Sequence, residues 1–262
     1  MKPTLTKLFF FGFLFIALTG MKAIDSKKYV KFSDKLYASK YELTNIEYRE
    51  FLTQLHENNE LEKLSVCLPD SALWTERFED SYNAPYVAHY HKHPAYNSYP
   101  AVNISKQGID HFCNWLSDKY NNDSKKEFKK VKFRLPTEKE WNLFAAPMLN
   151  QELPWQGEHP YEINKKGKKV PFANIKIHDY STNSENYVWD NAFITSAVGS
   201  YKANKLGLFD IIGNVAEYTS DGKIKGGSWE NVIEECFIDK VQDFQIPDPR
   251  VGFRLVMEVM VE

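Results

Sequence analysis

The chain has 262 residues, of which 43% are hydrophobic and 26% charged, and its formal net charge is −2 at pH 7. This length and composition fit one large globular domain or two small ones. The slightly acidic balance gives no reason to expect a nucleic-acid partner, because proteins that bind nucleic acid present a basic surface.

The first 23 residues have the pattern of a secretory signal peptide. Lys2 and Lys7 form a basic start, an apolar run covers 8–18, and small or polar residues follow. The run is too short to span a bilayer. We therefore expect 1–23 to be cleaved and 24–262 to form one exported domain that is periplasmic, outer-membrane-associated or secreted, with no membrane span after cleavage. An uncleaved anchor is the alternative.

Three helices are predicted along the rest of the chain. The first and third begin with the T-x-x-E spacing of a capping box, Thr44 to Glu47 and Thr137 to Glu140, and the second begins near Ser105. Apolar residues then recur at helical spacing in the first two helices. These residues are Ile46, Phe51, Leu52 and Leu55 in the first helix, and Ile109, Phe112, Cys113 and Leu116 in the second.

Two long segments, 69–100 and 147–204, contain few periodic runs and many aromatic, proline, Asn and Asp residues. Loops of that length are ordered only by side-chain packing or by bound ions. The chain shows no internal repeat and no clear linker, so one domain is the expected count.

Six short blocks are spread over the whole chain after the leader. They are ELTNIEYREFL (42–52), PAVNIS (100–105), RLPTEKEW (134–141), GLFDIIGNVAEY (207–218), KGGSW (225–229) and GFR (252–254). In that order they resemble the sulfatase-modifying-factor family, whose founding members are the formylglycine-generating enzymes. The segments 68–86 and 93–100 also resemble an insertion in a Bacteroidetes-type branch that includes lipoproteins of gliding motility and type IX secretion.

The resemblance implies an α+β domain, the formylglycine-generating-enzyme-like variant of the C-type lectin fold. Such a domain has little regular secondary structure. It combines small antiparallel sheets, two to three helices and long irregular loops, which agrees with the pattern of elements predicted from the residues.

The resemblance also implies a copper(I) site of two thiols that activates oxygen to oxidise a substrate cysteine. Counted from Ser228, the two thiol positions are Asn231 and Cys236. An Asn amide oxygen is a hard, neutral donor and does not replace a thiolate at a soft ion, so the count argues against copper. Whether the chain is an enzyme is left open, because Cys236 is either the working sulfur of an oxidase or a small packed residue. A site that joins Cys236 to Cys67 or Cys113 is a further alternative.

Two calcium sites are implied by the same resemblance, since calcium takes oxygen donors from side chains and from backbone carbonyls. The first set comprises the side chains of Asn174 and Asp190 and the carbonyls of Ile175 and Ala192, and the second comprises the side chains of Asn214 and Glu217 and the carbonyl of Val215. The alternative is that the amide and carboxylate side chains of these sets only bond loop backbone.

The sequence HYHKH offers a different metal site. His89, His91 and His93 alternate, so on a strand they would share one face, as in a three-histidine cluster. Only His93 belongs to the pattern of the family. The family pattern therefore favours a solvated or packed edge over a zinc site.

These residues favour an exported, non-catalytic module that is stabilised by calcium and binds a protein or glycan partner at the cell envelope. The groove that holds a substrate peptide in the enzymes would hold this partner, with Ser228, Trp229 and Asn231 on its floor. The rival is a formylglycine-generating-type oxidase that acts on a protein cysteine or another thiol through Cys236.

Overall fold

The structure is a computed structural model. It describes residues 26–77, 84–146, 153, 160–179, 184–186 and 192–262. The signal peptide predicted at 1–23 therefore lies outside the described residues.

Six α-helices occur in the described part of the chain, where the sequence predicted two to three. They are α1 (Asn45–Glu57), α2 (Leu61–Cys67), α3 (Leu73–Arg77), α4 (Ala84–His89), α5 (Lys106–Asn121) and α6 (Glu138–Ala145). Three short 3₁₀ turns accompany them: η1 (Ser26–Lys28), η2 (Pro94–Tyr96) and η3 (Ile233–Glu235). The additional helices α2, α3 and α4 have only 7, 5 and 6 residues, too few for a periodic apolar pattern to reveal them.

The starts of the three predicted helices are confirmed, because local hydrogen bonds fix each of them. At α1 the Thr44 N–H donates to Glu47 Oε2 at 3.0 Å. At α6 the Thr137 N–H donates to Glu140 Oε2 at 2.9 Å, and the Glu140 N–H donates back to Thr137 Oγ1 at 3.2 Å. At α5, Ser105 Oγ accepts a backbone N–H at 3.0 Å. Each cap satisfies donors that a helix leaves free at its first turn.

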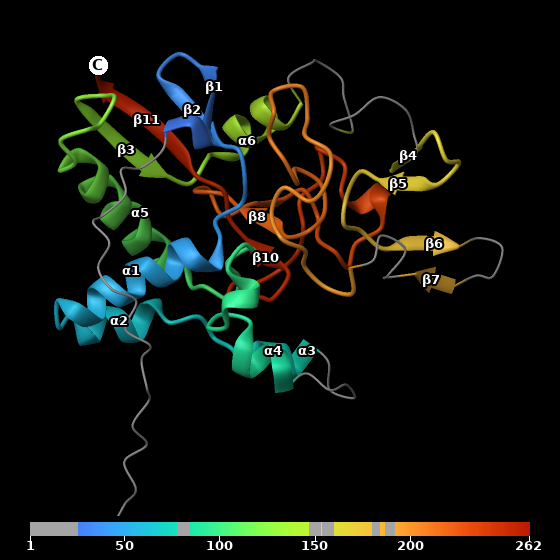
Figure 1. Cartoon of the computed structure of the whole chain (residues 1–262), viewed down its shortest axis with the longest axis horizontal. Helices are drawn as coiled ribbons and strands as arrows, with labels where there is room; N and C mark the ends of the chain where they lie inside the picture. The colour runs from blue at the N-terminus through green and yellow to red at the C-terminus, as the bar shows by residue number, and fades with distance from the viewer. Residues whose placement is uncertain (1–25, 78–83, 147–152, 154–159, 180–183, 187–191) are drawn as a thin grey trace, which may run out of the picture.

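The strands form four small sheets. They are β1 (Tyr29–Ser33), β2 (Leu36–Ser39), β3 (Lys130–Arg134), β4 (Tyr161–Ile163), β5 (Lys169–Pro171), β6 (Ile177–Asp179), β7 (Ser184–Asn186), β8 (Ala216–Tyr218), β9 (Ile224–Lys225), β10 (Val251–Gly252) and β11 (Val256–Val261). The largest sheet is antiparallel with the order β1-β2-β11-β3, so the last strand lies between two early ones (Figure 1). β4–β5 and β6–β7 form two separate antiparallel pairs. In the sheet of β10, β8 and β9, the β10–β8 pair is parallel, which departs from the antiparallel expectation.

An apolar core lies between the four-stranded sheet and the helices α1, α2 and α5 (Figure 1). Phe51 and Phe112 meet edge to face in it, with ring centroids 5.6 Å apart. The prediction for Ile46 was wrong, because this side chain is 49% exposed. Five residues separate Ile46 from Phe51, which is about 140° around a helix of 3.6 residues per turn.

The second half of the chain is mostly loop, and three further buried clusters among the described residues hold it together. The KGGSW block requires its glycines here. Both Gly226 and Gly227 have positive φ, at 86° and 68°. A Cβ at Gly226 would meet the Ile211 carbonyl oxygen at 2.6 Å, and one at Gly227 would overlap Cys236 Sγ. The two glycines therefore allow this turn to approach its neighbours closely.

Candidate functional site

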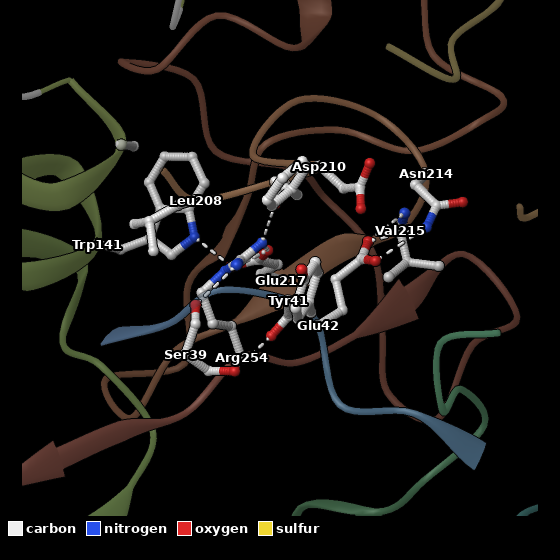
Figure 2. A network of polar contacts seen from close by, with 12 residues as sticks. Ser39, Tyr41, Glu42, Trp141, Leu208, Asp210, Asn214, Val215, Glu217 and Arg254 are labelled. Atoms are coloured by element: carbon white, nitrogen blue, oxygen red, sulfur yellow. Dashed lines mark hydrogen bonds and ion pairs between the residues drawn. The ribbon is translucent and has the colours of Figure 1, made fainter. Parts of the chain in front are cut away.

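Three of the sequence blocks meet at a buried ion pair (Figure 2). The Arg254 guanidinium, from GFR, donates to Glu217 Oε1 at 2.6 and 2.9 Å. The Trp141 indole N–H, from RLPTEKEW, donates to Glu217 Oε2 at 2.7 Å. Arg254 also donates to the backbone carbonyls of Ser39 and Phe209, at 2.9 and 2.7 Å. Both charged side chains are buried, so the pair ties four distant segments into one unit.

A second carboxylate, that of Glu42 from the ELTN block, lies beside this pair and binds an amide instead of a cation. Asn214 Nδ2 donates to Glu42 Oε2 at 2.9 Å, and the Val215 N–H donates to Glu42 Oε1 at 3.3 Å. The amide oxygen of Asn214 accepts the Ser196 N–H at 2.7 Å and Asn174 Nδ2 at 3.2 Å. Asn214 thus links the ELTN segment, through the contact with Glu42 seen in Figure 2, to two loops of the second half.

Negative charge exceeds positive charge in this network. Glu42, Asp210 and Glu217 are buried together with a single cation, Arg254. Burial raises the pKa of Glu42, and the nearby Asp210 and Glu217 carboxylates raise it further. Burial also raises the pKa of Asp210, to about 6. The cluster therefore favours either a proton or a bound cation, because uncompensated charge is costly away from water.

The first predicted calcium set fits a cation at its central side chain. Asn174 is buried, and its amide oxygen has no hydrogen-bond partner although its nitrogen donates to the Ile194 carbonyl at 2.8 Å. A buried amide oxygen without a donor is suited to a hard cation. Ile175, next to Asn174 in sequence, and Ala192 are both buried. Asp190 lies outside the described residues.

The second predicted set does not fit in the same way. The carboxylate oxygens of Glu217 accept from Arg254 and Trp141, and the amide oxygen of Asn214 accepts two N–H groups. The predicted donor at Val215 is its backbone carbonyl, and this residue is buried. Of the acidic groups in this network, Asp210 has a carboxylate oxygen without a hydrogen-bond partner. A donor at this position is better sought at Asp210, since both Glu42 oxygens already accept N–H groups.

The thiols of the chain do not assemble into a soft-metal site. All three cysteines are buried and unpaired, so no disulfide forms. Cys67 and Cys113 belong to the core of α1 and α5, while Cys236 packs beside Gly227 in another cluster. Burial raises the pKa of Cys67 to about 11, that of Cys113 to about 12, and that of Cys236 well above its ordinary value. A thiol held neutral in this way is a poor metal ligand, because the thiolate is the binding form.

The three predicted groove residues are placed unequally. Ser228 is buried, and Trp229 is only 2% exposed within an apolar cluster, so neither side chain offers an open surface to a partner. Asn231 is partly exposed. Its amide oxygen accepts from the Ser228 N–H and Oγ at 2.9 and 2.8 Å, and its nitrogen donates to Glu235 Oε2 at 3.0 Å. At the position of the family's first thiol, Asn231 therefore stabilises the turn that follows KGGSW.

The predicted alternation of histidines on a strand was wrong. Helix α4 ends at His89, and His91 turns inward and is buried, with no hydrogen-bond partner at either ring nitrogen. Burial lowers the pKa of His91 to about 3. Within the described ranges, no group of three or more His, Cys, Asp or Glu side chains is arranged to hold a metal ion.

The sequence blocks contained three functional candidates whose roles were not assigned from sequence. Glu42, Asp210 and Arg254 stand in ELTN, GLFD and GFR, and their partners become visible only in three dimensions. The available signal was a charged residue inside an otherwise apolar block, since such residues are rarely buried without a partner.

Among the helices that the structure describes, none is long and apolar enough to cross a membrane.

Comparisons with known proteins agree with this geometry. The sequence model of the sulfatase-modifying factor enzyme 1-like domain matches residues 17–259. The formylglycine-generating enzyme of Mus musculus is 23% identical in an alignment of 228 residues that covers 79% of this chain and 53% of the mouse protein. The chain thus spans about half the length of that curated relative.

Two solved structures are similar in fold. Treponema denticola variable protein 1 has a TM-score of 0.50 and 21% identity, over 85% of this chain and 84% of its own. CarF has a TM-score of 0.50 and 20% identity, over 86% of each chain. At this identity the similarity shows the fold alone. That fold is the α+β, formylglycine-generating-enzyme-like variant of the C-type lectin fold.

Proposed function

The chain belongs to the sulfatase-modifying factor enzyme 1-like family, and from that premise we propose that it binds a partner and does not oxidise one. In this proposal the protein is exported, lies at the cell envelope, and acts as a scaffold or binding module for a protein or a glycan. Calcium stabilises its loops.

The observation that carries the proposal is the isolation of Cys236. Its sulfur is buried against Gly227 and has no second thiol in its cluster, and Asn231 is engaged in hydrogen bonds to the turn. Copper(I) is soft and requires thiolate ligands. One buried neutral thiol beside an amide does not supply them.

Calcium is proposed at the two places where a buried side-chain oxygen, Asn174 Oδ1 or Asp210 Oδ1, lacks a hydrogen-bond donor. Asn174 would bind one ion, with the carbonyls of Ile175 and Ala192 and the side chain of Asp190 as the remaining predicted donors. Asp210 would bind a second ion beside the Glu42 carboxylate, and this ion would neutralise the excess negative charge of the network. A bound ion links loops that are distant in sequence and so offsets part of their ordering entropy, about 1–2 kcal/mol per residue.

The oxidase alternative is tested with a Cys-x-Pro-x-Arg peptide, copper and oxygen, followed by mass spectrometry of the peptide. We expect no loss of mass at the peptide cysteine. The matched variant is Asn231→Cys, which places a thiol at the position where the resemblance expects the first of the two copper ligands. Copper binding by this variant and not by the parent chain would support the proposal. Peptide oxidation by the parent chain that disappears in Cys236→Ala would overturn it.

Calcium is tested by the thermal midpoint of metal-stripped protein with and without the ion. At 100 times its dissociation constant a ligand stabilises by about 2.7 kcal/mol, and for a chain of this size that corresponds to roughly 5–10 °C. Asn174→Ala and Asp210→Asn should each reduce the shift, while Asp34→Asn, at an exposed aspartate, should keep it. An unchanged midpoint in the parent chain would remove calcium from the proposal.

Export is tested by immunoblotting of fractionated source cells and by sequencing the mature N-terminus. The proposal expects the protein in the envelope or the medium, with residues 1–23 absent. A protein that stays in the cytoplasm with its first 23 residues intact would contradict it.

A further inference from the structure

A small pocket opens beside the buried Trp229. Its volume is about 200 Å³. The lining residues come from two segments far apart in sequence, and they are Tyr86, Tyr96, Tyr99, Phe193, Thr195 and Ser196, with the smaller contributions of Ala192 and Ile194. Pockets for drug-sized ligands are roughly 300–1,000 Å³, so this one matches a single small ring.

The three tyrosines are held in place by the protein itself. Tyr86, Tyr96 and Tyr99 are partly buried, and each packs against the apolar cluster that contains Trp229. Tyr96 and Tyr99 meet at a ring-centroid distance of 5.1 Å and an angle of 69°, and the buried Tyr90 contacts both. Rings fixed at such angles form walls and not one flat platform. A ligand would meet a preformed site and would order few side chains on binding.

The pocket is neutral and rich in hydroxyl groups. None of its lining side chains carries a charge at neutral pH, and burial raises the pKa of Tyr86 and of Tyr96, so these phenols keep their protons. Thr195 Oγ1 lies 2.9 Å from Tyr90 OH, and Ser196 Oγ lies 3.0 Å from Tyr201 OH. Each hydroxyl oxygen has two lone pairs and one proton, so these groups keep hydrogen-bonding capacity toward a ligand.

We propose that this pocket binds one neutral pyranose ring of a glycan, the apolar faces of the sugar lying on the tyrosine and phenylalanine rings and its hydroxyls bonding those of the pocket. Among the lining residues that the structure describes, no cation is available to an anionic ligand. A proline ring would fit the aromatic walls but would not use the remaining hydrogen-bonding capacity of the Thr195 and Ser196 hydroxyls. The inference rests on the proposed binding function and names the class of its partner.

The test uses the full mature chain and saturation-transfer NMR with methyl glycosides of glucose, mannose, galactose and N-acetylglucosamine. A proline-rich peptide is the competing probe. We expect at least one glycoside to bind with a dissociation constant on the order of 1 mM, as one small ring allows. Tyr96→Ala and Tyr99→Ala should weaken it about tenfold, the loss that one aromatic contact explains.

Two control variants separate contact from folding. Tyr161→Ala, at a tyrosine on β4 outside the pocket, should leave the affinity unchanged within about twofold, which corresponds to less than 0.5 kcal/mol. Tyr99→Phe keeps the ring and removes the hydroxyl, so it should bind more weakly than the parent chain and more tightly than Tyr99→Ala. Its thermal midpoint reports whether the fold is kept.

Binding of the proline-rich peptide alone, or of no glycoside at all, would overturn the glycan assignment. Equal losses in Tyr96→Ala and Tyr161→Ala would overturn the pocket as its location. Neither result changes the oxidase assay with the Cys-x-Pro-x-Arg peptide. Failure of this inference is therefore distinguishable from failure of the proposed function.

Discussion

The core beneath α1 and α5 and the network around Arg254 hold two parts of one molecule by different means. The first buries aromatic and aliphatic side chains between regular elements, and its energy comes from apolar surface removed from water. The second buries carboxylates, an arginine and amides among loops, and its order depends on hydrogen bonds that each have a specific partner.

The difference teaches where this chain tolerates change. In an apolar core, the loss of stability grows with the volume of the cavity that a smaller side chain leaves, because neighbouring side chains close that cavity only in part. A buried polar network behaves otherwise, because removal of one group leaves its partner charged and unsatisfied. The candidate calcium donors belong to the second kind of region, so a bound ion would stabilise loops whose order depends on specific polar contacts.

The largest expected effect is at the buried ion pair. Arg254→Met leaves Glu217 without its cation and should lower the free energy of unfolding by about 3–5 kcal/mol. Chemical denaturation measures it. The exposed pair of Lys106 and Asp110 is the control, and Lys106→Met should cost less than about 1 kcal/mol. Equal costs at the two pairs would break the comparison between the regions.

A smaller loss is expected at the turn that covers Cys236. Gly227→Ala places a side chain at positive φ and against the Cys236 sulfur, which together should cost about 3 kcal/mol. Gly207→Ala is the matched control, because its φ is 82° but a Cβ there meets nothing within 4 Å, and its cost should be near 1 kcal/mol. If the two variants have the same midpoint in urea, Cys236 is not packed as described.

The free energy of unfolding should decrease at acidic pH because His91 is buried in its neutral form. Its folded pKa of about 3 lies below the unfolded value of about 6.5, so the neutral form is favoured in the fold. Stability from this group is therefore fully present above pH 6.5, and it is lost as pH falls toward 3. The loss is about 2 kcal/mol at pH 5. The free energy of unfolding, measured by denaturation between pH 7 and 5, should fall less steeply with pH for His91→Leu than for the parent chain. An equal pH dependence in the two proteins would show that burial of His91 does not carry this loss.

The smallest effect is expected on α1. Ile46→Ser replaces a half-exposed side chain and should change stability by less than about 0.5 kcal/mol. Leu55→Ala, in the core on the same helix, should cost about 2–5 kcal/mol. A larger loss at Ile46 than at Leu55, measured by thermal unfolding, would reverse the assignment of the buried face.

The caps and the family blocks were predictable because they are local or fixed in order. Thr44 with Glu47 and Thr137 with Glu140 lie three residues apart, and their bonds form as the sequence predicts. The absence of a first thiol at Asn231 is equally a property of the sequence. The short helices α2 to α4 were not predictable, since tertiary packing and not periodicity holds helices of that length.

The sequence by itself indicated the family and the starts of the long helices, and it shows that asparagine stands at 231, where the resemblance places a thiol. Only the tertiary structure decided that Trp229 is buried and that Tyr86, Tyr96 and Tyr99, which pack against its cluster, line a pocket. It also decided that Glu42 meets Asn214 across 172 positions of the chain. The physical reason is the range of the interactions. A cap depends on residues one turn apart, whereas the burial of a ring or a charge depends on every segment that folds around it.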